Sequence, residues 1–341
     1  MKAPKNLLGI IFRAREITSL SFVAALFIIV GFVNPGFLSP DNLLLTLNSS
    51  VVFALLAAGT AFIIITGEID VSIGAVMGLC AAVSGSMIRD GSSWALAVGA
   101  ALLVGVASGA VNGAGHLFLK IPSIIMTLGT MGVIRGLIYV FTGGRWVENV
   151  PSAFKSLSQV NVAGVSVFYW GALAVFIAGS ALMKRTRRGQ FFAAIGDNTP
   201  CAVMLGIPVR GMKMLSFIIA GVFYAAAGVM FVSRTGFVTP VTGSGYEMKA
   251  IAACVLGGVS LSGGVGSLLG AAVGALFMAS VGRILVFLNS SADDDVITGV
   301  MLIVIVVADA LIQQRTVERS RRQRLLAKTR AGGEPKEADH A

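Results

Sequence analysis

Long apolar runs, separated by short polar or basic stretches, follow one another along almost the whole chain. A helix that crosses a membrane needs about 20 mostly apolar residues, and ten runs come close to this length. The pattern therefore predicts an all-α polytopic membrane protein with about ten transmembrane helices. The expected spans lie at residues 17–34, 47–66, 71–88, 94–112, 123–141, 167–183, 214–232, 246–260, 265–288 and 296–312.

The run at 246–260 is short and leads into the glycine-rich stretch 257–267. It is either a short span or a partly re-entrant segment. The backbone of a re-entrant segment must be buried by other parts of the protein. The glycine-rich stretch lacks the lysine of a phosphate-binding P-loop, so it predicts a tight helix break, used for plain packing or as a hinge or pathway lining. Residues 257–264 weakly resemble residues 67–74, through a parallel internal repeat or through chance.

The distribution of lysine and arginine indicates the orientation of the spans. With the N-terminus inside the cell, 19 of the 26 basic residues fall on internal segments and five on external ones. Internal segments of membrane proteins carry the excess of basic residues. The charge pattern therefore predicts that both termini are cytoplasmic and that the number of spans is even.

Composition narrows the class of protein further. The chain is 56% hydrophobic and 12% charged, whereas soluble domains have about 45–50% apolar and about 25% charged residues. This excludes a soluble enzyme, a nucleic-acid binder and a disordered protein. Cys80 and Cys254 lie in apolar runs, and His116 is the one histidine outside the tail, so we expect neither a disulfide framework nor a metal site nor catalytic residues.

Three regions follow from these patterns. Residues 1–16 form a cytoplasmic N-terminal segment, residues 17–312 the transmembrane domain, and residues 313–341 a basic, partly disordered cytoplasmic tail. The longest internal loop, 184–213, has a helix cap at Asp197, Asn198 or Thr199 and a stop at Gly206. The short amphipathic helix predicted there either docks into a partner's groove or lies on the membrane surface.

Glu68 and Asp70 stand out because their surroundings carry no other charge. A carboxylate in hydrocarbon is costly, so each needs water, protein or a partner. They belong either to a gate near the internal mouth or to a solvated turn in which Asp70 caps the next helix. The pathway and gate candidates are Glu68, Asp70, Ser72, Gly74, Asn112, Thr127, Thr130, Gly257, Gly258, Ser262 and Gly263.

Charged residues in the middle of spans are few; Arg135 and Arg283 are two, and both need partners. Ion-coupled secondary transporters usually place ionisable residues inside several spans. A secondary transporter is therefore the weaker alternative, and the pattern favours energy supplied by another protein.

Several motifs in fixed order resemble the ribose-type ABC importer permeases, in particular their sugar and autoinducer-2 branch. They are GEIDVSIG at 67–74, KIPSIIMTLGT at 120–130, RG at 135–136, TGG at 142–144, AIGDN at 194–198, LGI at 205–207, AIAACVLGGVSLSGG at 250–264 and GS at 266–267. The likeness covers about 300 residues and leaves out the tail. Three positions depart from the pattern expected of that branch, which has Arg-Asn in place of Gly67-Glu68 and leucine in place of Tyr246.

The resemblance implies a permease subunit of the bacterial inner membrane that imports a small neutral carbohydrate-like ligand, either autoinducer-2 or a monosaccharide such as rhamnose or ribose. It implies separate ATPase subunits that bind ATP and Mg, a periplasmic substrate-binding protein, and a sister permease or a second copy of this chain. It also makes the loop 184–213 the ATPase-coupling loop. The coupling residues implied are Gly196, Asp197, Asn198, Ala202, Leu205, Gly206 and Ile207.

Overall fold

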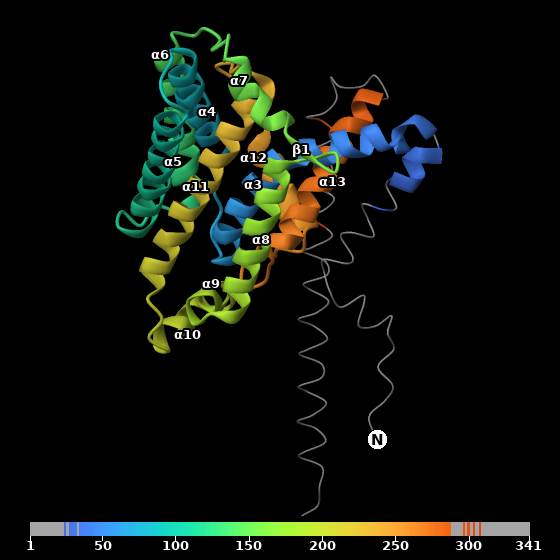
Figure 1. Cartoon of the computed structure of the whole chain (residues 1–341). Helices are drawn as coiled ribbons and strands as arrows, with labels where there is room; N and C mark the ends of the chain where they lie inside the picture. Colours follow the sequence, from blue (N-terminus) through green and yellow to red (C-terminus); the bar gives the residue numbers. More distant parts are fainter. Residues whose placement is uncertain are drawn as a thin grey trace, which may run out of the picture.

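A computed structural model describes residues 24, 27–32, 34–287, 296, 299–300, 303 and 307. The predicted spans 17–34 and 296–312, the N-terminal segment and the tail lie wholly or largely outside these residues. The described part is a helical bundle with one small hairpin (Figure 1). Its helices are η1 (Pro35–Leu38), α3 (Pro40–Ile65), α4 (Ile73–Arg89), α5 (Trp94–Leu117), α6 (Ser123–Thr142), α7 (Ser152–Ser156), η2 (Leu157–Gln159), α8 (Val167–Arg185), α9 (Arg187–Asp197), α10 (Thr199–Met204), α11 (Val209–Thr235), α12 (Tyr246–Leu256) and α13 (Leu268–Phe287).

Six of these helices are long and apolar enough to cross a membrane: α3, α5, α6, α8, α11 and α13. Each coincides with one of the predicted spans. α4 has 17 residues and α12 has 11, which at 1.5 Å per residue gives lengths of roughly 25 and 16 Å. Both are shorter than the hydrocarbon core of about 30 Å. Within the predicted span 246–260, residues 257–260 are not helical, and the count of about ten spans stays a prediction.

The core of the bundle lies around α3 and α11. α11 packs against α5, α3 and α4, and α13 packs against α3 and α12. Small residues permit close approach of helix backbones. At Gly105 of α5 and Gly221 of α11, each backbone fills the space that a Cβ on the other glycine would need. This close contact explains part of the high glycine content of the chain.

The two ends of the bundle are different. α9 and α10 lie at the lower end in Figure 1 and α7 lies at the opposite end. The second end carries an antiparallel hairpin of β1 (Asn161–Val162) and β2 (Val165–Ser166). A further bridge pairs Val147 with Val238 and so ties the connection after α6 to the connection after α11.

The loop 184–213 contains more helix than the sequence predicts. α10 agrees with the short helix predicted there, whereas α9 falls where we expected irregular chain. Thr186 caps α9 by accepting a hydrogen bond from the N–H of Gly189 at 3.0 Å, and Phe192 and Ile195, three residues apart, are buried. The arginines and the glycine in its first turn conceal this pattern in the sequence, because they weaken the apolar periodicity.

Candidate functional site

The connection between α3 and α4 lies at the end of the bundle that carries α9 and α10. Residues 67–72 are not helical, so their backbone groups need partners outside a helix. Two side chains of α6 provide them: Ile69 N–H donates to Ser123 Oγ at 3.3 Å, and Val71 N–H donates to Thr127 Oγ1 at 3.1 Å. α6 therefore holds this segment in place, and Thr127 is one of the predicted candidates that reach it.

A chain of buried polar groups continues from this segment to α5. Asp70 is 2% exposed, and its Oδ1 accepts hydrogen bonds from the backbone N–H and the hydroxyl of Ser72, each at 2.7 Å. Asn112 of α5 donates its Nδ2–H to Ser72 Oγ at 2.9 Å, while its Oδ1 has no partner among the described residues. Burial raises the pKa of Asp70, against the lowering effect of the hydrogen bonds from Ser72. The interpretation of Asp70 as part of a solvated turn is wrong.

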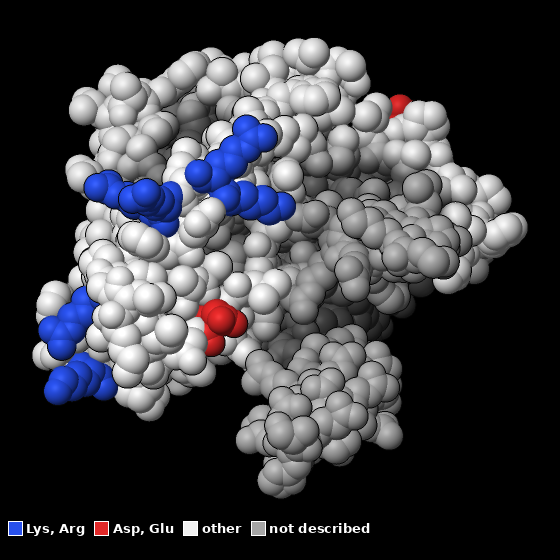
Figure 2. Space-filling view, turned by 90° about the horizontal axis from the view of Figure 1, so that it is seen from below, with Lys and Arg blue, Asp and Glu red and all other residues white. Residues whose placement is uncertain are grey.

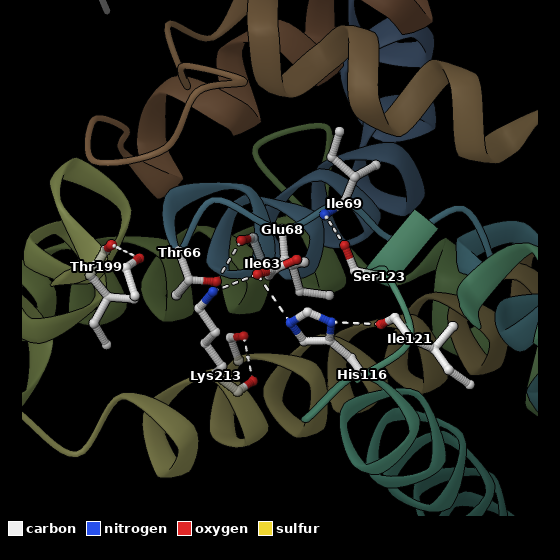
Figure 3. A network of polar contacts seen from close by, with 11 residues as sticks. Ile63, Thr66, Glu68, Ile69, His116, Ile121, Ser123, Thr199 and Lys213 are labelled. Carbon is white, nitrogen blue, oxygen red and sulfur yellow. Dashed lines mark hydrogen bonds and ion pairs between the residues drawn. The ribbon is translucent and has the colours of Figure 1, made fainter. Parts of the chain in front are cut away.

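Glu68 lies between two cationic side chains from different helices (Figure 3). Its Oε1 is 2.5 Å from Nζ of Lys213 in the first turns of α11 and 3.1 Å from Nε2 of His116 near the end of α5. The Glu68 and Lys213 side chains are each 12% exposed. Burial raises the pKa of Glu68, but hydrogen bonds from His116, Lys213 and Ser123 outweigh it and lower the pKa to about 2. Glu68 is therefore an ionised carboxylate that joins three elements.

Three glycines meet beside this ion cluster. Gly196 near the end of α9 lies against Gly67 and Gly263, and Gly264 N–H donates to Ile65 O at 3.0 Å. A Cβ on Gly196 would overlap the carbonyl oxygen of Ile65 and the amide nitrogen of Gly264. Only a residue without a side chain permits this approach. The contact, which we call the glycine junction (Gly67, Gly196, Gly263), joins α9 to both glycine-rich segments, 67–74 and 257–267.

α10 has the cap and the stop that the sequence predicts. Asn198 Oδ1 accepts the N–H of Cys201 at 2.9 Å, and Pro200 lies in the first turn. Ala202 is 2% exposed and faces the bundle, and its carbonyl accepts the N–H of Ile207 at 3.0 Å. Gly206 separates the helix from α11, and Asp197 lies exposed at the end of α9 against Gly264.

The outer face of α10 carries apolar side chains without cover from the described part of the chain. The exposed fractions are 60% for Val203, 87% for Met204 and 73% for Leu205. Lysines and arginines lie in separate groups on this face of the molecule (Figure 2). The basic residues that flank α10 in the sequence are Lys184, Arg185, Arg187, Arg188 and Arg210. A short apolar ridge with basic residues on both sides in the sequence is suited to a groove of a partner protein.

The remaining candidates do not all reach this site. Gly74, in the first turn of α4, lies against Gly243 in the connection before α12. Thr130 donates its hydroxyl to Met126 O within α6, at 3.0 Å, and joins none of the groups above.

Of the candidate residues in the stretch 257–267, only Gly263 belongs to the glycine junction. This stretch contains no helix, which agrees with the predicted helix break, although the predicted spans 246–260 and 265–288 extend into it. Gly263 belongs to the glycine junction, whereas Gly257 packs against Gly270 of α13 and Ser262 is exposed. Gly258 lies between the end of α12 and these residues, outside the junction.

Both arginines inside predicted spans have partners. Arg135 of α6 donates to Thr242 O at 2.6 Å, and Arg283 of α13 donates to Asn42 Oδ1 at 2.8 Å. Neither arginine belongs to the site at the α9–α10 end.

Sequence reasoning missed His116 and Lys213 as members of the site. The sequence analysis used them only to argue against a zinc site and to orient the chain. One signal in the sequence could have found them, because a carboxylate such as Glu68 in an uncharged neighbourhood needs a partner. His116 and Lys213 each lie near the inner end of an expected span.

Residues 42–306 match the family described as "Branched-chain amino acid transport system / permease component". The chain belongs to this family. It is therefore a permease component of a transport system rather than an enzyme, and its long apolar helices are those of a multi-pass membrane protein. No solved structure matches the chain.

Curated relatives agree with a permease role. This permease is 41% identical, over 90% of each chain, to the autoinducer 2 import system permease protein LsrC of Enterobacter sp. (strain 638) and to that of Klebsiella pneumoniae. It is 39% identical, over 91% of each chain, to the LsrC protein of Escherichia coli (strain K12 / DH10B). The resemblance to importer permeases of the autoinducer-2 branch is confirmed.

Proposed function

We propose that this permease is the membrane-spanning subunit of an ATP-driven importer for autoinducer-2 or a closely related sugar. The identity of about 40% to LsrC proteins over nine-tenths of the chain supports this ligand class. Rhamnose and ribose are the alternative ligands. The few charged side chains inside spans suit a neutral polar ligand.

The observation that supports docking of a partner ATPase is the exposed apolar face of α10. ATPase subunits dock on α10, and ATP and Mg bind to those subunits rather than to this chain. The coupling residues are Gly196, Asp197, Asn198, Ala202, Leu205, Gly206 and Ile207. In this assignment α9 and α10 face the cytoplasm, both termini are cytoplasmic, and about ten spans cross the bacterial inner membrane.

The rest of the importer follows from this arrangement. The permease pairs with a sister permease or a second copy of itself, and a periplasmic binding protein delivers ligand to the opposite end. ATP binding moves α9 and α10, and the glycine junction passes the motion to the segments 67–72 and 257–267. ATP can switch the importer between its outward-open and inward-open states only if it binds more tightly to one of these two states than to the other.

A pair of substitutions at Leu205 tests the docking assignment. Leu205→Asp places a charge on the exposed apolar face, and we expect binding of the ATPase to weaken by at least about tenfold, since a central interface side chain contributes about 2 kcal/mol or more. Leu205→Met is the matched control, because it keeps the face apolar and should retain binding. Both variants should insert into the membrane like the native chain.

The readouts are ATPase recovery with the tagged permease and uptake of labelled autoinducer-2, rhamnose and ribose by cells. Uptake that is lost in Leu205→Asp and kept in Leu205→Met supports the proposal. Unchanged ATPase recovery and uptake in Leu205→Asp would contradict it, as would uptake by the native permease that needs an ion gradient and no ATPase.

A further inference from the structure

Two contacts connect the loop 184–213 to the segment 67–72. One is the charged contact of Lys213 with Glu68, and the other is the backbone contact of Gly196 with Gly67. Lys213 reaches Glu68 from α11, and Gly196 of α9 lies against Gly67. We propose that Glu68 is the positioning residue that transmits displacement of α10 to the segment 67–72 and so to α4. This inference rests on the proposed importer function and assigns the residue through which its ATPase acts on the pathway.

The first step is a stiff connection from α10 to Lys213. Only residues 205–208 separate α10 from α11, and they are tied at both sides. Ile207 N–H donates to Ala202 O and Met212 N–H donates to Pro208 O, each at 3.0 Å. A displacement of α10 therefore carries Lys213 with it rather than being absorbed by a flexible loop.

The second step is the low exposure of the charged contact. The Lys213 and Glu68 side chains are 12% exposed and 2.5 Å apart. Charges shielded from water interact more strongly than charges at the surface, and separation of a buried pair leaves each charge without compensation. Movement of Lys213 therefore moves Glu68, because separation of the two is costly.

His116 provides a fixed point for the same carboxylate. Its Nδ1 is 2.9 Å from Ile121 O, and its Nε2 is 3.1 Å from Glu68 Oε1. A carbonyl and a carboxylate only accept hydrogen bonds, so both contacts form together only when both ring nitrogens carry a proton. Glu68 thus separates two cationic side chains, one on α5 and one on α11, and without its charge these helix ends repel each other.

The third step leads from Glu68 to α4. Segment 67–72 is not helical and is held by Ser123 and Thr127 of α6, and it ends in the buried contact of Asp70 with Ser72. α4 begins at Ile73, five residues after Glu68. A shift at Glu68 is therefore delivered to α4.

Reconstitution of the complete importer in proteoliposomes tests this role. ATP hydrolysis and uptake are measured in the same vesicles, first for the native permease with labelled autoinducer-2, rhamnose and ribose. The ligand that is taken up is then used for the variants Glu68→Gln, Lys213→Gln and the charge-exchanged pair Glu68→Lys with Lys213→Glu. Asp90→Asn is the matched control, because it breaks the exposed Arg89–Asp90 pair beyond the end of α4.

We expect Glu68→Gln and Lys213→Gln to hydrolyse ATP while uptake per ATP falls roughly fivefold or more, the lower end of typical coupling between sites. The charge-exchanged pair restores the contact between positions 68 and 213 but places a cation beside His116, so it should recover part of this ratio. Asp90→Asn should not change it. A purely structural role predicts instead that hydrolysis and uptake fall together.

An unchanged ratio of uptake to ATP hydrolysis in Glu68→Gln would overturn the inference, whether the two activities stay at the native level or fall together. Those results leave the proposed function in place, since the native importer still takes up ligand. A native permease that shows no ATP-dependent uptake of any of the three ligands would instead remove the proposed function, and the inference with it.

Discussion

Gly196 shows at the scale of one residue how this chain joins α9 to the bundle. The backbone of Ile65 and of Gly264 occupies the space that any side chain at this position would need. The contact places the end of α9 directly on the two glycine-rich breaks. A movement of α9 therefore displaces the backbone at residues 67 and 263 directly, because no side chain lies between them.

Substitution of Gly196 tests this close contact. Gly196→Ala forces the backbones apart, and we expect a loss of about 1–3 kcal/mol in stability, as for other overpacked sites. Gly211→Ala in α11 is the control, because open space surrounds a Cβ there and alanine favours a helix by up to about 1 kcal/mol. Thermal unfolding in detergent should show a lower melting temperature for Gly196→Ala than for Gly211→Ala. Equal stability of the two variants would contradict the close contact at Gly196.

The acidity of Glu68 gives a second prediction at this scale. Its pKa is lowered from 4.5 to about 2, so its ion pairs stabilise the fold above pH 4.5, and this contribution is lost as the pH falls from there towards 2. The stability difference between the native chain and Glu68→Gln should be full near pH 5–6 and vanish near pH 2. Unfolding measured across this range checks it, and a difference independent of pH would contradict the ionised cluster.

The sequence identified Glu68 and Asp70 as residues that need partners, but it did not identify the partners. Lys213 is 145 positions from Glu68, and one sequence without relatives gives no information on such distant contacts. The two departures from the family pattern at Gly67-Glu68 fall on the glycine junction and the ion cluster. The unusual positions were thus visible, whereas their common location required the fold.

At the scale of elements, local signals predicted α10 well and α9 poorly. A cap, a proline in the first turn and a glycine stop define α10 in the sequence, while α9 begins with arginines and a glycine. The apolar runs located all six long helices and the junction at 67–70, but run length alone did not show that residues 71–72 and 257–260 are not helical. Those breaks depend on tertiary contacts at glycines and on side chains of α6.

The cap of α10 gives a prediction at this scale. Asn198→Ala removes the acceptor for the N–H of Cys201, and loss of an N-cap costs about 1 kcal/mol. We expect amide hydrogen exchange in residues 199–204 to quicken by roughly fivefold, since 1.4 kcal/mol corresponds to a factor of ten. Asn198→Asp keeps an acceptor and should exchange at the native rate. Equal exchange in the alanine variant would show that α10 does not depend on its cap.

At the scale of the whole molecule, the two ends of the bundle differ. α9, α10 and the ion cluster lie at one end, and the hairpin, α7 and the Val147–Val238 bridge lie at the other. Segment 67–72 lies at the α9–α10 end and leads into the short helix α4. This is the arrangement expected of an importer subunit that receives force at one end and ligand at the other.

The most direct test of this account is purification of the tagged permease from its native membrane in mild detergent, with mass spectrometry of the proteins that accompany it. The account predicts an ABC ATPase together with either a second, different permease or no other permease. The ATPase should be lost from the Leu205→Asp variant. A permease that is recovered without any ATPase, even after crosslinking, would contradict the claim that ATP hydrolysis on a partner drives it.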